Sequence, residues 1–523
     1  MPQETIYSLI PFWIVIIPLL MSVAVFLTAM RPVRKYFSSE YDDLVDNSKD
    51  NTEPVSGGML RLIFLLVGTV IPLALAIKLY SLVSQGYVVI CNIDVLPPLG
   101  LNFRVDILSQ YMTLLFTFFA LIIVIYSIGY MKGDPLPQRF FGFLMLVYAG
   151  SLGVVLAGDL FSLFLFFEFM SIMYFVLIVH KANPVSVAAG LKFLFMTIFA
   201  GVSLFMAVVI IYWQTGSLSL NTSGLVSEIS VFSLMAFIGF IIAFGTKAAM
   251  FPLHFWMPDA YTHAPLPAAL FSSVIMLKVG VYGLIRVFYN VFGTEYLAAV
   301  NWDNIIVVIA CFTILFGSTI AIAQDDLIRR LAYSGIAQVG YIILGIALFN
   351  PYGLIGAVFH ITAHAFMKGC LFLCAGVIIK VTGNRSIAKM KGIGYQLPVT
   401  MLAFTIAAIT AVGMPPFNIF VTKWHLSLGA LQINQPIIII VLLISSMLNA
   451  AYYLPIAIHA FLGQDQSQGE HGHHREFKRS NFREPGAIML VPVILLALGC
   501  VVFGLPTQNW PLEIVKSVAA LLY

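Results

Sequence analysis

Five lysines within apolar segments are the residues with the clearest capacity for chemistry in this sequence. They are Lys192, Lys247, Lys278, Lys368 and Lys423. A lysine at the centre of a membrane-spanning helix costs about 2.5–3.5 kcal/mol on insertion scales, so its presence indicates a function. An apolar medium favours the neutral form of both amines and carboxylic acids. As a result, buried amines and carboxylic acids can gain or lose a proton near neutral pH. The pattern therefore indicates movement of protons or other ions.

A single glutamate is the best carboxylate partner for these amines. Glu168 lies in FSLFLFFEFMSIMYF, and the five residues before it are all apolar. If Glu168 lies about 7 Å from Lys247, their attraction at an effective dielectric constant of about 20 is about 2.4 kcal/mol. Separating the two would let Lys247 lose its proton, so a small movement would change a protonation state. An ion pump requires this kind of coupling.

Two histidines extend the set of exchangeable groups. His360, His364 and Lys368 recur at i, i+4 and i+8 in VFHITAHAFMKGCLF, which places them along one face of a helix. A proton or ion relay, polar packing between helices and a zinc site are the three interpretations. The zinc site lacks a glutamate general base and an obvious third ligand. We expect Lys278, His360, His364, Lys368 and Lys423 to continue the path.

Four polar residues are candidates for a secondary proton path. They are Lys192, together with His254, Asp259 and His263 of PLHFWMPDAYTHAPLPAAL. The last three lie near the expected cytoplasmic end of the helices. Asp259 has a second interpretation, as a helix cap or a local ion-pair partner.

The sequence contains no motif for a cofactor. It has no P-loop, no GxGxxG that opens a helix and no CxxC cluster. Its five cysteines are scattered, and we interpret them as small core residues. We therefore expect neither a cofactor nor a metal in this chain, and we place any iron–sulfur cluster or other redox centre in partner subunits.

The composition indicates which kind of secondary structure holds these side chains. Hydrophobic residues make up 60% and charged residues 10% of the 523 residues, whereas soluble domains carry about 25% charged residues. At about 20 residues per span, we expect an all-α polytopic membrane protein with about 14 transmembrane helices. A β-barrel is disfavoured, because the apolar runs are continuous and about twice as long as a barrel strand. The predicted spans are 7–29, 59–83, 107–130, 139–157, 160–180, 187–213, 231–250, 266–290, 303–323, 329–348, 353–380, 397–420, 433–462 and 486–508.

Basic residues predict the orientation of these helices. They cluster in the loops after odd-numbered helices, while the loops after even-numbered helices hold little more than Arg104 and Arg286. The positive-inside rule then makes the odd loops cytoplasmic and puts both termini on the outer face of the cell membrane. The first apolar run has no clear cleavage site after it, so we expect it to remain as the first helix. The odd-loop clusters include Arg31, Arg34, Lys35, Lys132, Arg139, Lys181, Arg329, Arg330, Lys380, Arg385, Arg475 and Lys478.

The spacing of the lysines suggests an internal repeat. A separation of 176 positions holds both for Lys192 and Lys368 and for Lys247 and Lys423. Two five-helix units follow, and because five is odd, the second must cross the membrane with inverted orientation. The alternative is that the two equal separations are a coincidence.

Each predicted unit contains a helix that is expected to be broken. Pro252 follows Lys247, and Pro415 and Pro416 precede Lys423. Proline removes a backbone donor, and such breaks persist at membrane depth only where protein or water satisfies the freed groups. The breaks therefore favour a hydrated path, with an ordinary proline kink as the alternative.

Four regions follow from this organisation. Residues 1–138 hold helices 1–3 and an acidic cytoplasmic loop at 31–58, and residues 139–290 form the first repeat. Residues 303–462 form the second repeat, and residues 463–523 hold a His-rich cytoplasmic loop, helix 14 and a short tail. The His-rich segment 464–484 is interpreted as a flexible polar loop or, alternatively, a metal-binding loop.

Six motifs in this order resemble the antiporter-like subunits of respiratory complex I, Mrp-type cation/proton antiporters and membrane-bound hydrogenases. They extend from about residue 107 to 423. The motifs are LFLFFEFMS, GTKAAMFPLHFWMPDAYTHAPLPAAL, MLKVGVYGLIR, AQDDLIRRLAYSGIAQVGY, HITAHAFMKGCLFL and GMPPFNIFVTK. The resemblance implies a fourteen-helix fold with two inverted five-helix repeats.

The resemblance also implies a role for each matching residue. Glu168 matches the glutamate next to the pumping lysine, Lys247 that lysine, and Lys278 the connecting lysine. His360, His364 and Lys368 match the central histidine–lysine axis, and Lys423 matches the terminal residue near the exit channel, which is lysine or glutamate across the family. Without a long lateral helix, the chain is most similar to the D-type Mrp subunit and the shorter complex I subunits.

The sequence therefore predicts a proton-translocating, or sodium/proton-exchanging, subunit of a multi-subunit membrane complex. An Mrp-type Na⁺/H⁺ antiporter without redox partners is one alternative, and a stand-alone carrier of an organic solute is another. Expected partners are other membrane subunits, including related antiporter-like ones, with protons, sodium as a possible second ion, and the lipid bilayer. Nucleic acid is not expected. Whether the complex performs an enzymatic redox reaction is left open.

Overall fold

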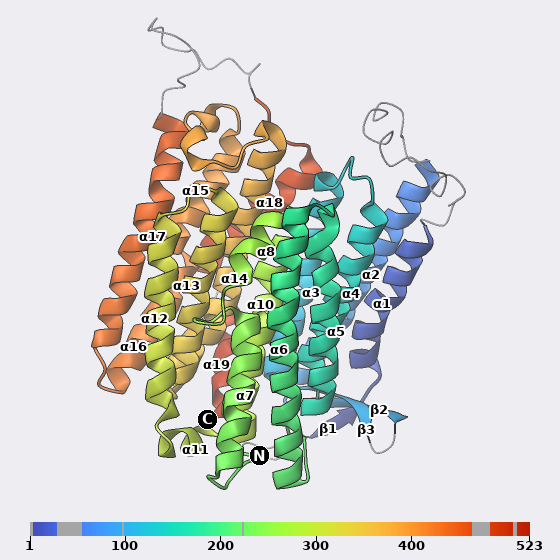
Figure 1. Cartoon of the computed structure of the whole chain (residues 1–523), viewed down its shortest axis with the longest axis vertical. Coiled ribbons are helices and arrows are strands. Elements are labelled where there is room, and N and C mark those ends of the chain that lie inside the picture. The colour runs from blue at the N-terminus through green and yellow to red at the C-terminus, as the bar shows by residue number, and fades with distance from the viewer. Residues whose placement is uncertain (1–3, 29–54, 97–98, 222–223, 463–481, 506–509) are drawn as a thin grey trace, which may run out of the picture.

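The computed structural model describes residues 4–28, 55–96, 99–221, 224–462, 482–505 and 510–523. Within this part of the chain, twelve helices are long and apolar enough to cross a membrane. They stand roughly side by side in one bundle (Figure 1). The all-α polytopic class is confirmed, while the count of fourteen spans and the inverted repeat stay predictions. The acidic loop up to residue 54 and the histidines His471, His473 and His474 lie outside the described residues.

The first half of the bundle contains helices that mostly begin and end near the predicted bounds. Asp106, Asp159 and Asn183 each cap a helix by accepting a hydrogen bond from the backbone of its first turn. The helices are α1 (Ile10–Leu27), α2 (Val55–Val83), α3 (Ile107–Tyr130), α4 (Pro137–Leu156), α5 (Leu160–Ile178), α6 (Pro184–Thr215), α7 (Val231–Ala248), α8 (Met257–His263), α9 (Leu266–Phe271) and α10 (Leu277–Arg286). Two π-helical segments flank α10, at Ser272–Met276 and Val287–Phe292.

The second half of the bundle comprises the helices after Phe292. Its helices are α11 (Thr294–Ala299), α12 (Trp302–Ile322), α13 (Leu327–Ala347), α14 (Pro351–Thr382), α15 (Pro398–Val412), α16 (Asn418–Gln432), α17 (Ile437–Leu462), α18 (Ala487–Val502) and α19 (Trp510–Leu522). The predicted span 397–420 is wrong as one helix, because α15 ends at Val412. Gly413 adopts φ +85° there, and the pair Pro415–Pro416 cannot continue a helix.

The first half contains a comparable break. Helix α7 ends at Ala248, Ala249 has φ +57°, and no regular helix resumes until α8 begins at Met257. Both predicted breaks are thus present, one directly after Lys247 and one before Lys423.

A small sheet and helix α19 are among the elements that were not predicted. A three-stranded sheet joins β1 (Thr5–Tyr7), β2 (Val88–Leu96) and β3 (Leu99–Val105), with β1 parallel and β3 antiparallel to β2. The expected C-terminal tail instead contains helix α19, which packs on α3 and α14. The sheet, α11 and α19 all lie at the same end of the bundle (Figure 1), which we call the sheet end.

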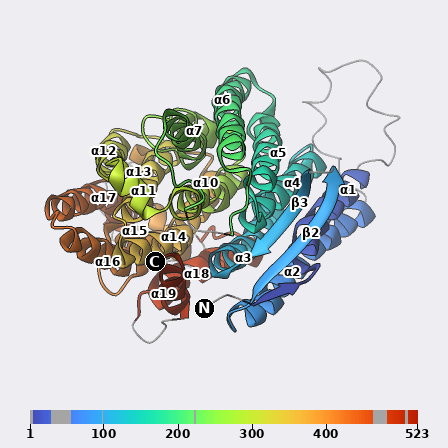
Figure 2. The same cartoon turned by 90° about the horizontal axis from the view of Figure 1, so that it is seen from below.

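The centre of the bundle is formed by α10, α13 and α14. Figure 2 shows α1 and α2 on one flank and α16 and α17 on the other, with α10 and α14 between them. An 18-residue stretch within Leu266–Phe292 is entirely buried, whereas only a third of the corresponding stretch in α17 is. Polar side chains on these central helices are therefore shielded from the bundle surface.

Candidate functional site

Lys247 occupies the last turn of α7, where the helix breaks. Its side chain is 1% exposed. The ammonium group donates to Ser171 Oγ on α5 at 2.6 Å and to Thr197 Oγ1 on α6 at 3.1 Å. The rings of Phe167 and Phe193 lie 4.9 and 5.2 Å from Nζ and add cation–π stabilisation. Two hydroxyls and two aromatic faces thus take the place of a counterion.

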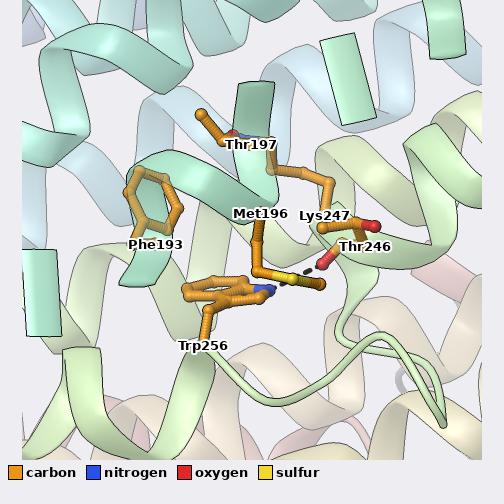
Figure 3. A pocket seen from close by; sticks show the side chains of 6 residues that line it. All are labelled: Phe193, Met196, Thr197, Thr246, Lys247 and Trp256. Atoms are coloured by element: carbon orange, nitrogen blue, oxygen red, sulfur yellow. Dashed lines mark hydrogen bonds between the residues drawn. The ribbon is translucent and has the colours of Figure 1, made fainter. Parts of the chain in front are cut away.

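The surroundings of Lys247 are tightly packed. Figure 3 shows the side chains around it, with Trp256 donating from Nε1 to the carbonyl oxygen of Thr246 at 2.8 Å. The space between these residues is too small for a water molecule. In this conformation the lysine is closed off from water on the side of Trp256. The lining residues are Phe193, Met196, Thr197, Thr246, Lys247 and Trp256.

Glu168 lies next to Lys247 without pairing with it. The two interact electrostatically, yet no ion pair within 4.0 Å joins them in the described structure. Glu168 Oε1 is buried and has no hydrogen-bond partner among the described residues. The carboxylate rests against Gly201, where a methyl group would collide with it. The predicted pair is therefore present as neighbours in a separated arrangement.

The other side of Glu168 opens on the bundle surface. A hollow of about 360 Å³ lies between α5 and α6 next to its carboxylate. Val202 and Phe205 on its rim are 62% and 50% exposed. Glu168 is thus positioned between the buried lysine and the outer face of these two helices. The hollow is lined by Phe164, Glu168, Ile198, Gly201, Val202 and Phe205.

Lys278 joins the two halves of the bundle. Its Nζ lies 2.7 Å from His364 Nδ1 on α14 and also donates to the carbonyl oxygen of Ser273. Both side chains are fully buried. Gly280, two residues further on, lets α10 pass directly against the backbone of Lys247. A hydrogen bond therefore connects the first half of the bundle to the second at its buried centre.

His360 continues the row along α14. Its ring stacks with that of His364 at 6.0 Å between centroids. Its Nε2 lies 3.0 Å from Gln338 Oε1 on α13, and its Nδ1 lies 2.9 Å from Thr422 Oγ1 on α16. Thr422 precedes Lys423, so the row reaches the second helix break.

Lys423 ends the row. Its Nζ donates to Ser446 Oγ at 2.6 Å and to the carbonyl oxygen of Val412 at 2.9 Å. This carbonyl is the last of α15 and has been freed by the break. Tyr341 lies under Nζ at 5.2 Å and beside the His360 ring at 5.4 Å.

Lys368 is buried on the same helix face but has partners of its own. Its ammonium group donates to Ser334 Oγ at 2.5 Å, Leu331 O at 2.8 Å and Tyr453 Oη at 3.0 Å. Three acceptors match the three N–H groups of an ammonium. Lys368 thus has no hydrogen bond to Lys278, the two histidines or Lys423 among the described residues, and it lies beside the row that they form.

The four residues of the predicted secondary path lie apart from this row. Lys192 is on α6, but its side chain is 44% exposed and pairs with Asp259 at 2.7 Å; such a side chain can reach past the apolar surface to water. Asp259 also pairs with Arg329 at 3.3 Å, as its local-partner interpretation predicts. His254 is buried and packed against three phenylalanine rings, while His263 is half-buried at the end of α8.

Sequence reasoning missed one buried charge pair. Arg286 falls inside the predicted span 266–290 but was counted with the basic residues of the loop after it; in the structure it is 2% exposed within the span Leu266–Phe292 and pairs with Asp106 at 2.7 Å. The loop interpretation is wrong because the apolar segment continues for six residues past the arginine. A usable signal was present: Tyr282 and Arg286 follow Lys278 at intervals of four, on one helix face.

Comparisons with known proteins give a consistent result. A family model described as "NADH:quinone oxidoreductase/Mrp antiporter, TM" matches residues 157–449, and one described as "NADH-Ubiquinone oxidoreductase (complex I), chain 5 N-terminus" matches residues 98–141. Over 418 residues, 78% of this chain and 83% of the relative, the sequence is 37% identical to NADH-quinone oxidoreductase subunit N of Desulforudis audaxviator.

A Na(+)/H(+) antiporter subunit and a chain of an Mrp complex are similar as well. The D-type subunit of a Na(+)/H(+) antiporter from Alkalihalophilus pseudofirmus is 29% identical over 428 residues, which cover 80% of this chain and 84% of the relative. A chain in the structure of the Mrp complex from Dietzia sp. DQ12-45-1b superimposes with a TM-score of 0.82 at 25% identity, over 98% of this chain and 97% of that one. The similarity thus extends over nearly the whole fold.

Proposed function

Because the chain belongs to the NADH:quinone oxidoreductase/Mrp antiporter transmembrane family, we propose that its buried lysine–histidine row carries protons as part of a membrane complex. The chain is an antiporter-like, multi-pass membrane subunit. The observation that carries the proposal is the 2.7 Å contact between Lys278 Nζ and His364 Nδ1, which links groups able to exchange protons across the centre of the bundle.

Proton loading begins at Glu168 and Lys247 in this proposal. When Glu168 approaches, its charge stabilises the ammonium form of Lys247; when it withdraws, that attraction falls with distance. The structure has the withdrawn arrangement, with Lys247 held by Ser171 and Thr197. Movement of one carboxylate therefore changes the proton affinity of the lysine.

Transfer onward uses the central row. A proton moves between Lys278 and His364 along their hydrogen bond. No hydrogen bond joins His364 to His360 among the described residues, so a bridging water or a rotation of a ring would complete the step toward Thr422 and Lys423. Each imidazole has two nitrogens, so it can receive a proton on one and release it from the other. Lys423, beside the freed carbonyl of Val412, is the exit group of the path.

The transported ions and the orientation are part of this proposal. Protons are moved, with sodium exchange as the alternative favoured by the similarity to the D-type subunit of a Na(+)/H(+) antiporter. Both ends of the described chain lie at the sheet end of the bundle (Figure 1), which supports placing both termini on one face of the membrane. That this face is the outer face of the cell membrane is part of the proposal. Co-purification of iron–sulfur subunits would favour a redox-driven complex, and their absence would favour an Mrp antiporter.

Transport by the assembled complex tests the proposal. The complex is expressed with its partner subunits, and proton movement is followed in inverted membrane vesicles with a pH-sensitive dye. Lys247→Ala is expected to abolish the driven signal while co-purification of the other subunits is unchanged. Lys78→Ala is the matched control, because Lys78 is an exposed lysine on the apolar helix α2. Undiminished transport by Lys247→Ala would refute the proposal.

A further inference from the structure

A second buried polar row runs from the centre of the bundle toward the sheet end. Lys278, Tyr282, Arg286 and Asn290 follow each other at intervals of four along α10 and the π-helical segment after it. Arg286 donates from Nε to Tyr282 Oη at 2.9 Å and from Nη1 to Asn290 Oδ1 at 3.2 Å. All four side chains are buried.

The row continues into the first turn of α3. Arg286 Nη2 donates to Asp106 Oδ1 at 2.7 Å and to Ser109 Oγ at 2.8 Å. Asp106 accepts on its other oxygen from Arg104 Nη1 at 2.8 Å. Arg104 is the half-buried member of the group, and it lies on β3 at the sheet end. Polar side chains thus extend from the level of Lys278 to the edge of the bundle.

Such a row would offer protons a way out of the central path. The rise from Lys278 to Arg286 is about 12 Å for eight residues, and Tyr282, Ser109 and Asp106 supply hydroxyls and a carboxylate along it. In the described structure no hydrogen bond joins Lys278 to Tyr282. A water or a rotation of Lys278 would bridge that gap.

The charges in this row oppose the passage of protons. A guanidinium does not release its proton in proteins, and the carboxylate of Asp106 is occupied by two arginines and the Ser109 backbone amide. Arg104, Arg286 and Asp106 together carry one net positive charge. A fixed positive charge at a narrow point repels protons and other cations, as in selective channels.

We propose that Arg286 and Asp106 form an electrostatic barrier that prevents protons from leaking out of the Lys278–His364 centre toward the sheet end. This rests on the proposed function, because a barrier of this kind serves a proton path beside it. A buried ion pair adds little net stability over an apolar pair of similar volume. The proposed path through Glu168, Lys247 and Lys423 uses neither Arg286 nor Asp106. The pair therefore acts by repelling protons and not by carrying them.

Passive proton leak tests the barrier without relying on driven transport. The assembled complex is reconstituted in liposomes, a pH step is imposed with the membrane potential clamped, and the internal pH is followed. Arg286→Gln removes one positive charge and leaves Asp106 paired with Arg104, so the net charge of the three residues falls from one to zero. At about 10 Å and an effective dielectric constant of about 20, removing a unit charge changes the energy of a proton enough for an approximately tenfold faster leak.

Three further variants separate a barrier from a structural tie. Arg286→Lys keeps the positive charge and is expected to leak no more than the parent. Adding Lys278→Met to Arg286→Gln is expected to abolish the extra leak, since the leak starts from that lysine. Arg104→Gln also removes one positive charge, but at the edge of the bundle and farther from Lys278, so it is expected to give a smaller increase; it also serves if Arg286→Gln fails to assemble.

The outcomes distinguish this proposal from the proposed function. Parent-level leak in Arg104→Gln, or in an assembled Arg286→Gln complex, would overturn the barrier whatever the driven transport shows. Extra leak that persists with Lys278→Met would overturn it as well, because it would indicate general loosening. Driven transport that survives Lys247→Ala refutes the proposed function instead, and the leak measurement does not depend on that result.

Discussion

Lys247 and Lys423 stand beside the two helix breaks, 176 positions apart, yet their surroundings differ. Lys247 precedes its break, is held by two hydroxyls and two phenylalanine rings, and has Glu168 as a neighbour. Lys423 follows its break and is held by Ser446 and by the carbonyl of Val412. Among the described residues, its hydrogen-bond partners include no carboxylate.

This difference assigns different tasks to the two breaks. A carboxylate that approaches and withdraws makes the proton affinity of Lys247 variable, whereas a backbone carbonyl offers Lys423 a fixed acceptor. We infer that the first half controls proton loading and that the second half supplies a constant exit site. If so, equivalent substitutions in the two halves should have unequal effects.

The largest effect is expected from Lys247→Arg. Arginine retains the positive charge and the hydrogen bonds but does not release its proton. Driven proton transport should fall by at least about 100-fold, the contribution typical of a proton-transfer group. The rate is measured in inverted vesicles of the assembled complex. Parent-level transport would show that Lys247 contributes charge alone.

Glu168→Gln should have the next largest effect. The amide is similar in shape to the carboxylate but lacks its charge. For an assumed separation of about 7 Å, an attraction of about 2.4 kcal/mol is lost, and transport should slow about tenfold to fiftyfold. Glu228→Gln is a matched control, because Glu228 lies in the loop before α7. Equal rates in the two variants would remove the distinction between the two halves.

Substitution by glutamate should affect transport differently at the two lysine positions. At position 423 a carboxylic acid can still exchange protons next to the Val412 carbonyl, so Lys423→Glu should slow transport by less than about tenfold. Lys247→Glu would place a second acid beside Glu168 and should abolish transport. Similar losses in both variants would argue against a fixed exit site at position 423.

The smallest effect is expected from Thr197→Val. The side chain keeps its shape but no longer accepts the 3.1 Å hydrogen bond from Lys247. Loss of one such bond, about 1 kcal/mol, corresponds to an approximately fivefold change in the transport rate. Thr405→Val, on α15 with its hydroxyl bonded within the helix, is the control. A loss as large as that of Lys247→Arg would mean that Thr197 itself carries protons.

Much of the fold could be predicted from the sequence because each span is long and apolar. The breaks were predictable as well, since Pro252 and the pair Pro415–Pro416 forbid continuous helices near the lysines. The sheet was not predicted, because β2 and β3 are short segments between much stronger helical signals. Helix α19 was missed because it follows the last predicted span.

The site was predictable where burial alone selects the residue. Glu168, Lys278 and the histidines of α14 stand out because charged and polar groups are rare in apolar runs. Lys192 lies in an apolar stretch of the sequence and was expected to be buried. In the structure its side chain reaches the surface near the start of α6. Arg286 was misassigned for the opposite reason, since a basic residue late in a span was interpreted as a loop anchor.

Transport by a Lys278→Met variant is the most direct test of a proton path through the bundle centre. Methionine fills the same space, removes the exchangeable group next to His364 and leaves Glu168, Lys247 and Lys423 in place. The account predicts that driven proton transport is lost while the complex assembles and its passive proton leak stays at the parent level. Driven transport at the parent rate in the assembled Lys278→Met complex would contradict the account.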